Sequence, residues 1–151
     1  MKYIKQITPD EMNEAFRKYF ELCCKENRFI DLWDVKAFFA HPNDLCWSSL
    51  DGNAFYCIEV ESTSFVIFAF DKGDITNVKG IYESLYEAVR VGYPFIRLWG
   101  RIGRYRKILR PLIHWQNTNF FEPREGYEEL SCYFGHPHNV KVLESRLGIG
   151  E

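Results

Sequence analysis

The sequence feature that most constrains the fold is an uninterrupted apolar run near the middle of the chain, Phe65-Val66-Ile67-Phe68-Ala69-Phe70. A strand with one face in water alternates apolar and polar residues, whereas this run has no polar member. It therefore predicts a strand over residues 64–71 that is buried on both faces. Such a strand lies at the centre of a sheet, with helices covering each side.

A hairpin is predicted immediately before this central strand. Residues 53–61 form a second strand pattern, and Asp51-Gly52 separates them from a further candidate strand at 45–50. An Asp-Gly pair between two such runs is a strong hairpin signal, because both residues tolerate the positive φ of a tight turn. Ser62-Thr63 then turns the chain into the central strand, so we expect three consecutive antiparallel strands.

A helix is predicted immediately after the central strand, with another strand behind it. Apolar residues recur at helical intervals over 77–91, Gly92 suits the end of a helix, and Pro94 prevents its continuation. Residues 95–99 are again mostly apolar and predict a strand. Because a helix joins this strand to the central one, we expect the two strands to be parallel.

The two ends of the chain predict further elements around this sheet. Thr8-Pro9-Asp10-Glu11 combines an N-cap, a proline at the first helical position and a capping-box glutamate. The other expected elements are a strand at 2–7, helices at 8–25, 31–39, 101–110 and 139–147, and a hairpin of 119–122 with 127–134. The sequence thus predicts one domain over residues 1–151, of α+β class, with a mixed, mostly antiparallel central sheet flanked by helices.

Composition and charge exclude several classes of function. The formal net charge is −2, so the chain lacks the basic excess of a general nucleic-acid binder. No apolar run approaches the roughly 20 residues of a membrane span. The chain has five cysteines, mostly inside apolar segments, which indicates free buried thiols in a reducing compartment. We therefore expect a protein of the cytoplasm, or of a virion if the chain is phage-encoded, that binds neither membrane nor nucleic acid.

Two groups of residues are candidates for chemistry. Glu59 lies on a predicted strand, where partial burial would raise its pKa and suit it to act as a general base; the alternative is a solvent-facing strand residue. The second group is a basic run without acidic residues, which can grip phosphate, meet an acidic protein partner or form a solvated helix face. This run consists of Arg101, Arg104, Arg106, Lys107 and Arg110. Cys132, His136 and His138 have no evident fourth ligand, so no metal site is predicted.

The order of these elements resembles that of the GNAT N-acetyltransferase superfamily. The resemblance covers nearly the whole chain and implies a three-layer architecture, acetyl-CoA as acyl donor, and a cofactor loop between the central strand and the next helix. It points to the loop residues Lys72 and Gly73, together with Arg101 and Arg104, as cofactor-binding candidates. It also points to Tyr105 as the group that protonates the leaving thiolate.

The predicted loop departs from the family pattern, which is Arg/Gln-x-x-Gly-x-Gly/Ala. Gly73 and Gly80 are too far apart for that pattern, and Asp71 and Asp74 would repel a phosphate where it should dock. We therefore predict a GNAT-like protein that has lost the usual acetyl-CoA binding and uses no cofactor.

Such a protein would act by binding a protein partner or a second copy of itself, for example as a phage-associated or virion accessory protein. Aromatic residues make up 17% of the chain, which fits either large rings in the core or rings on an interaction surface. The alternative function is an acyl-CoA-dependent N-acetyltransferase with an unusual cofactor loop, which would use acetyl-CoA.

Overall fold

A computed structural model describes residues 1–26, 39–70, 78–120 and 122–149. Seven strands within these ranges form one sheet in the order β1-β2-β3-β4-β5-β7-β6. The strands are β1 (Ile4–Ile7), β2 (Leu45–Ser49), β3 (Ala54–Glu59), β4 (Ser64–Ala69), β5 (Phe95–Arg101), β6 (Trp115–Thr118) and β7 (Tyr127–Tyr133). The helices are α1 (Pro9–Lys25), α3 (Val78–Arg90), α4 (Arg106–Leu109) and α5 (Pro137–Leu147). Neighbouring strands are antiparallel except β4 and β5, which are parallel as expected.

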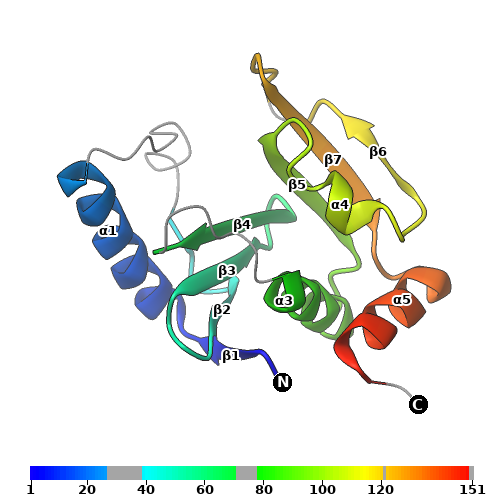
Figure 1. Cartoon of the computed structure of the whole chain (residues 1–151), viewed down its shortest axis with the longest axis horizontal. Coiled ribbons are helices and arrows are strands. Elements are labelled where there is room, and N and C mark those ends of the chain that lie inside the picture. Colours follow the sequence, from blue (N-terminus) through cyan, green and yellow to red (C-terminus); the bar gives the residue numbers. More distant parts are fainter. Residues whose placement is uncertain (27–38, 71–77, 121, 150–151) are drawn as a thin grey trace.

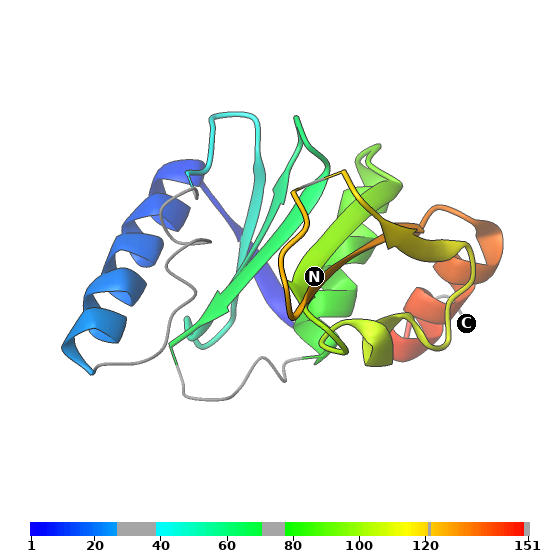
Figure 2. The same ribbon diagram turned by 90° about the horizontal axis from the view of Figure 1, so that it is seen from above.

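Helices cover both faces of this sheet and give the molecule three layers (Figure 1, Figure 2). Alternation along β3 explains how one strand serves two cores, because successive side chains point to opposite faces. Phe55 and Cys57 face α1 and pack with Met12. Tyr56 and Ile58 face the other way, into the core that α3 and α5 cover. The α+β class, the mixed sheet and the central place of β4 are therefore confirmed.

Local signals fixed several element boundaries. The Thr8 Oγ1 atom accepts a hydrogen bond from the Glu11 N–H at 3.1 Å, and the Glu11 carboxylate accepts one from the Thr8 N–H at 3.1 Å. This reciprocal capping box starts α1 where the sequence predicts it. Gly52 has a φ of +76° between β2 and β3, a conformation that glycine adopts without strain. The predicted Asp-Gly hairpin is therefore confirmed.

Three elements differ from the prediction. Residues 101–110 are not one helix: β5 continues to Arg101, because Gly100 and Arg101 pair with β7, and α4 covers only Arg106–Leu109. The strand expected at 119–122 is wrong, since β6 pairs with β7 earlier, at Trp115–Thr118. α5 begins at Pro137 rather than 139, with the His136 Nδ1 atom accepting a hydrogen bond from the His138 N–H at 3.1 Å. The helix expected at 31–39 falls almost entirely outside the described residues.

Two global features complete the fold. All five cysteines are free thiols, and four of them are buried. Among the described helices, none has both the length and the apolar character needed to cross a membrane.

Candidate functional site

β4 and β5 are the neighbours with the shortest pairing in the centre of the sheet. Ser64 faces Arg97, Phe65 faces Leu98, and the Arg97 N–H donates to the Thr63 carbonyl at 2.8 Å. β4 continues to Ala69 and β5 to Arg101, yet no further pair joins these described segments. The strands therefore diverge toward their C-terminal ends (Figure 1). We call this divergence, between residues 66–69 and 99–101, the β4–β5 fork.

Main-chain groups of β4 point into the fork. The Phe70 N–H donates to the Asn53 carbonyl beside β3, whereas the Thr63 carbonyl accepts from β5. Because main-chain groups alternate between the two sides of a strand, Ile67 and Ala69 turn their N–H and C=O groups toward β5. No main-chain hydrogen bond joins either residue to β5 within the described ranges. The fork thus offers the donors and acceptors of a strand edge inside a sheet.

Tyr105 and Arg104 lie over β5 beside the fork. The Tyr105 ring is buried and meets Phe65 edge to face, with ring centroids 6.3 Å apart. Gly100 makes room for both residues, since a Cβ atom there would lie 3.0 Å from the Tyr105 ring and 3.2 Å from Arg104 Cδ. The Arg104 Nε atom is buried and has no hydrogen-bond partner in the described structure. A buried cationic donor without a partner favours a ligand that brings an acceptor.

The rest of the basic run separates into different roles. Arg106 forms an ion pair with Glu128 at 2.7 Å and, through this hydrogen bond above all, lowers the Glu128 pKa. Arg101 is exposed at the end of β5, with its guanidinium 5.9 Å from the Tyr127 ring. Lys107 and Arg110 are also exposed. The other two cofactor candidates, Lys72 and Gly73, lie outside the described residues.

Glu59 lies on the face of the sheet opposite Tyr105, in a row of polar residues. Glu59 faces Ser64, Ser64 faces Arg97, and Arg97 faces Ser131 across four neighbouring strands. Directly opposed residues share one face of a sheet, so these four residues form what we call the polar row. Glu59 is half-buried, and burial, followed by the nearby Asp44 carboxylate, raises its pKa. A carboxyl with a raised pKa suits general-base chemistry near neutral pH.

Sequence reasoning missed Arg97, although one signal was present. Arg97 is the one charged residue in an otherwise apolar strand pattern at 95–99. A charge at such a position is uncommon unless something pairs with it. Its position in the polar row follows from strand register, which the sequence does not encode locally.

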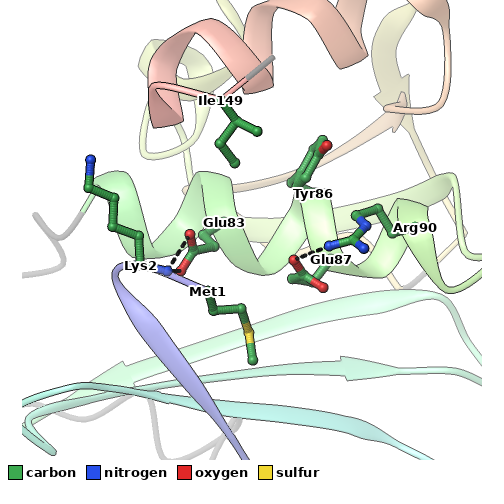
Figure 3. Close-up of a pocket in the computed structure, with 7 residues that line it drawn as sticks. All are labelled: Met1, Lys2, Glu83, Tyr86, Glu87, Arg90 and Ile149. Atoms are coloured by element: carbon green, nitrogen blue, oxygen red, sulfur yellow. Dashed lines mark hydrogen bonds and ion pairs between the residues drawn. The ribbon is translucent and has the colours of Figure 1, made fainter. Parts of the chain in front are cut away.

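A separate hollow of about 560 Å³ lies between the N-terminus, α3 and the C-terminal end of the described chain (Figure 3). Its lining residues are Met1, Lys2, Glu83, Tyr86, Glu87, Arg90 and Ile149. The Glu83 carboxylate accepts hydrogen bonds from the N–H groups of Lys2, Tyr3 and Ile4 at 3.0, 2.8 and 3.0 Å. Its charge therefore holds the start of β1, and the hollow contains no residue of the fork or the polar row.

The Cys-His segment has a structural role in the described chain. His136 caps α5, and the Cys132 Sγ atom lies 3.8 Å from the Ile113 carbonyl in the core. Burial raises the pKa of the Cys132 thiol to about 12, so it stays protonated. No group of three or more His, Cys, Asp or Glu residues in the described ranges is arranged to hold a metal ion.

No protein-family model and no curated protein matches this sequence. Among solved structures, the chain is similar to a GNAT-family acetyltransferase from Listeria monocytogenes, with a TM-score of 0.50 and 13% identity over 85% of this chain and 92% of that one. It is also similar to MesI, a CoA-dependent acyl-homoserine lactone synthase, with a TM-score of 0.56 and 16% identity over 98% of this chain and 96% of that one. The chain has a GNAT-like fold.

The GNAT-like fold confirms the resemblance that the order of elements predicted. At these identities the similarity concerns architecture, because side chains that bind or react can differ completely on one fold. The role of each residue around the fork therefore depends on its own surroundings.

Proposed function

We propose that this protein is an acyltransferase that takes an acyl group from a coenzyme A thioester and passes it to an amine. The observation that carries the proposal is the β4–β5 fork, with the main-chain groups of Ile67 and Ala69 turned toward it. Coenzyme A thioesters end in a narrow, extended arm that contains amide groups. Such an arm can pair with a strand edge as a further strand does.

The side chains around the fork suit both the phosphate end and the thioester end of such an acyl donor. Arg104 brings a buried, unpartnered cationic donor, and Arg101 brings an exposed charge at the wide end of the fork. Both suit phosphate or carbonyl oxygen. Tyr105 packs against Phe65, at the point where the two strands separate. Lys72 and Gly73 remain residues that are predicted to bind the acyl donor.

Glu59 and Tyr105 then take the two proton-transfer roles, each from its own face of the sheet, with the thioester in the fork between them. The amine nitrogen forms a bond to the thioester carbon while the carbon–sulfur bond breaks. The Glu59 carboxylate accepts the proton of the amine, and the Tyr105 hydroxyl supplies a proton to the leaving thiolate. The raised pKa of Glu59 supports the first role, because it brings the base nearer to neutral pH.

Amide exchange followed by NMR tests this proposal directly. Acetyl-CoA or a longer acyl-CoA should slow exchange at Ile67 and Ala69 at least tenfold, because bound amides are protected. Val66 and Phe68, whose N–H groups face β3, serve as internal controls and should not change. Gly100→Ala should weaken the protection, since its Cβ atom displaces Tyr105 and Arg104.

Arg17→Ala is the matched control variant, because Arg17 pairs with Glu14 and Glu21 on the exposed face of α1. It should bind the thioester as wild type does. Unchanged exchange at both Ile67 and Ala69 with millimolar thioester would show that the fork is not a donor site.

A second candidate function, protein binding, is favoured by aromatic side chains exposed on the β5–β7 side of the sheet. Phe95, Phe120 and Tyr133 are 40%, 60% and 44% exposed, and Phe95 directly faces Tyr133. Rings of this kind often anchor protein interfaces. The phage-associated or virion role is one form of this candidate. Sedimentation of wild type and of a triple serine variant tests self-association: a dimer that the serines abolish supports it, and a monomer at millimolar concentration contradicts it.

A further inference from the structure

Arg97 is a half-buried cation in the middle of the sheet, and no acid within the described ranges forms an ion pair with it. Its partners in the polar row on either side are the hydroxyls of Ser64 and Ser131. Glu129 lies on the same face one strand away, diagonal to Arg97, and its carboxylate accepts from Thr118 Oγ1 and from the Phe120 N–H. Glu59, the acid of the polar row, is two strands away, which is roughly 10 Å at the usual spacing of strands. Partial burial removes part of the solvation of the guanidinium, so an anion placed beside it would be stabilised.

The contacts of Arg97 orient its guanidinium. Its Nη1 atom donates to the Ser62 carbonyl and, at 3.0 Å, to Thr63 Oγ1. The central guanidinium carbon lies 3.7 Å from the centre of the Phe120 ring and 5.6 Å from that of Phe95, so two rings restrict the plane. The Nε and Nη2 atoms have no hydrogen-bond partner among the described residues. These two donors lie side by side, in the arrangement that binds both oxygens of a carboxylate.

We propose that the acyl acceptor is an amine that also carries a carboxylate, as an amino acid does, and that Arg97 binds this carboxylate. The inference rests on the proposed acyl transfer and names its substrate class. Glu59 and Arg97 lie on the same face with Ser64 between them. One small molecule can therefore place its amine at the base and its carboxylate at the cation. The transfer is unchanged: the nitrogen–carbon bond forms, the carbon–sulfur bond breaks, and the sulfur leaves as a thiol.

The test compares amines that differ only in the carboxylate. The assay compares wild type with Arg97→Ala and Arg97→Lys, using acetyl-CoA or octanoyl-CoA as acyl donor. The acceptors are a pool of amino acids, the matching decarboxylated amines, and phosphoethanolamine. Mass spectrometry counts the acylated products. We expect wild type to prefer the amino acids. Arg97→Ala should lower kcat/KM for them by 10- to 100-fold, the range for a lost charge-assisted hydrogen-bonded pair, and change the plain amines by less than threefold. Arg97→Lys should retain part of the kcat/KM for amino acids that Arg97→Ala loses.

A purely structural role for Arg97 predicts a different pattern. If the residue only holds the Ser62-Thr63 turn, its variants slow both classes of amine equally. Thr63→Gly is the control for this role, because it removes one partner of Arg97 at a position with a φ of +54°, which glycine accepts, and leaves the guanidinium in place. It should keep the wild-type preference. Equal loss for both classes, or a preference for plain amines or phosphoethanolamine, overturns the proposal.

Calorimetry without a thioester separates this inference from the proposed function. Titration of the amino-acid pool into wild type should give heat that Arg97→Ala lacks, even if no acyl transfer occurs. Arg97-dependent binding without turnover would contradict the acyltransferase and leave the carboxylate site standing. Turnover without any preference for carboxylates would contradict the site alone. If Arg97→Ala does not fold, Arg97→Lys supplies both comparisons.

Discussion

The buried carboxylate of Glu83 accepts hydrogen bonds from main-chain N–H groups. Its side chain is 1% exposed and one carboxylate accepts three consecutive N–H groups at the start of β1. The hydrophobic run around it on α3 gave no sign of this contact, because the partner residues lie about 80 positions away in the chain. The sequence could place Glu83 on a helix but could not predict its function.

Glu83→Ala should destabilise the fold by about 3 kcal/mol, because it leaves three N–H groups near the surface of the core without their acceptor. Glu83→Gln should lose less, since it keeps one acceptor oxygen. Urea denaturation measures both. Glu87→Ala, one turn further along α3 and paired with exposed Arg90, is the control and should cost less than about 0.5 kcal/mol. A similar loss for the two alanine variants would contradict this account of Glu83.

Glu59 should make stability depend on pH in the opposite sense to an ordinary paired carboxylate. Burial, then Asp44, raises its pKa in the folded protein. Its contribution to stability is therefore fully present below the unfolded-state pKa and is lost as pH rises through the higher folded-state pKa. Glu59→Gln cannot ionise, so it should gain stability relative to wild type as pH rises through that window. Thermal melting of both proteins from pH 4 to 8 measures the difference, and a gap that does not vary with pH would contradict the raised pKa.

Elements with complete local signals were predictable, and elements defined by distant partners were not. Thr8 and Glu11 determine the start of α1 within four residues, and Asp51-Gly52 determines the turn of the first hairpin. β6 had no such signal, because Gln116 and Asn117 are polar and become a strand only through pairing with β7. Arg101 belongs to β5 rather than to the expected helix for the same reason: its extended conformation depends on pairing with Tyr127.

Asn139 shows how a helix can be fixed by one polar side chain. It is fully buried, its Nδ2 atom donates to the carbonyls of Ile113 and Tyr133 at 2.8 Å each, and its Oδ1 atom accepts from the Ile113 N–H at 2.9 Å. These bonds join α5 to the segment before β6 and to the end of β7.

Asn139→Ala should therefore cost about 3 kcal/mol, since three partly buried main-chain groups lose their partner. Asn139→Asp should cost at least as much, because a carboxylate would face two carbonyl oxygens. Urea denaturation measures both, with Asn13→Ala as a milder comparison, because Asn13 is only half-buried and makes two such bonds, both to Ala40. An Asn139→Ala protein as stable as wild type would show that water replaces these bonds.

At the scale of the whole molecule, topology was more predictable than chemistry. The apolar run at 65–70 and the helix after it fixed the centre of the sheet and its parallel pair, and the GNAT-like order followed. The fork could not be predicted, because the number of residues over which two strands pair depends on twist and packing rather than on local pattern. The polar row could not be predicted for a related reason: its residues come from four strands, and strand register alone brings them side by side.

The short pairing of β4 with β5 also has a mechanical consequence. The sheet consists of a block of β1 to β4 and a block of β5 to β7, and two residue pairs are the main-chain ladder between them. Small rotations of one block against the other therefore stretch few hydrogen bonds, and most resistance to them comes from the shared core that α3 and α5 cover. A molecule bound along the fork would add bonds at the joint, stiffen it, and make the two blocks unfold as one unit rather than in sequence.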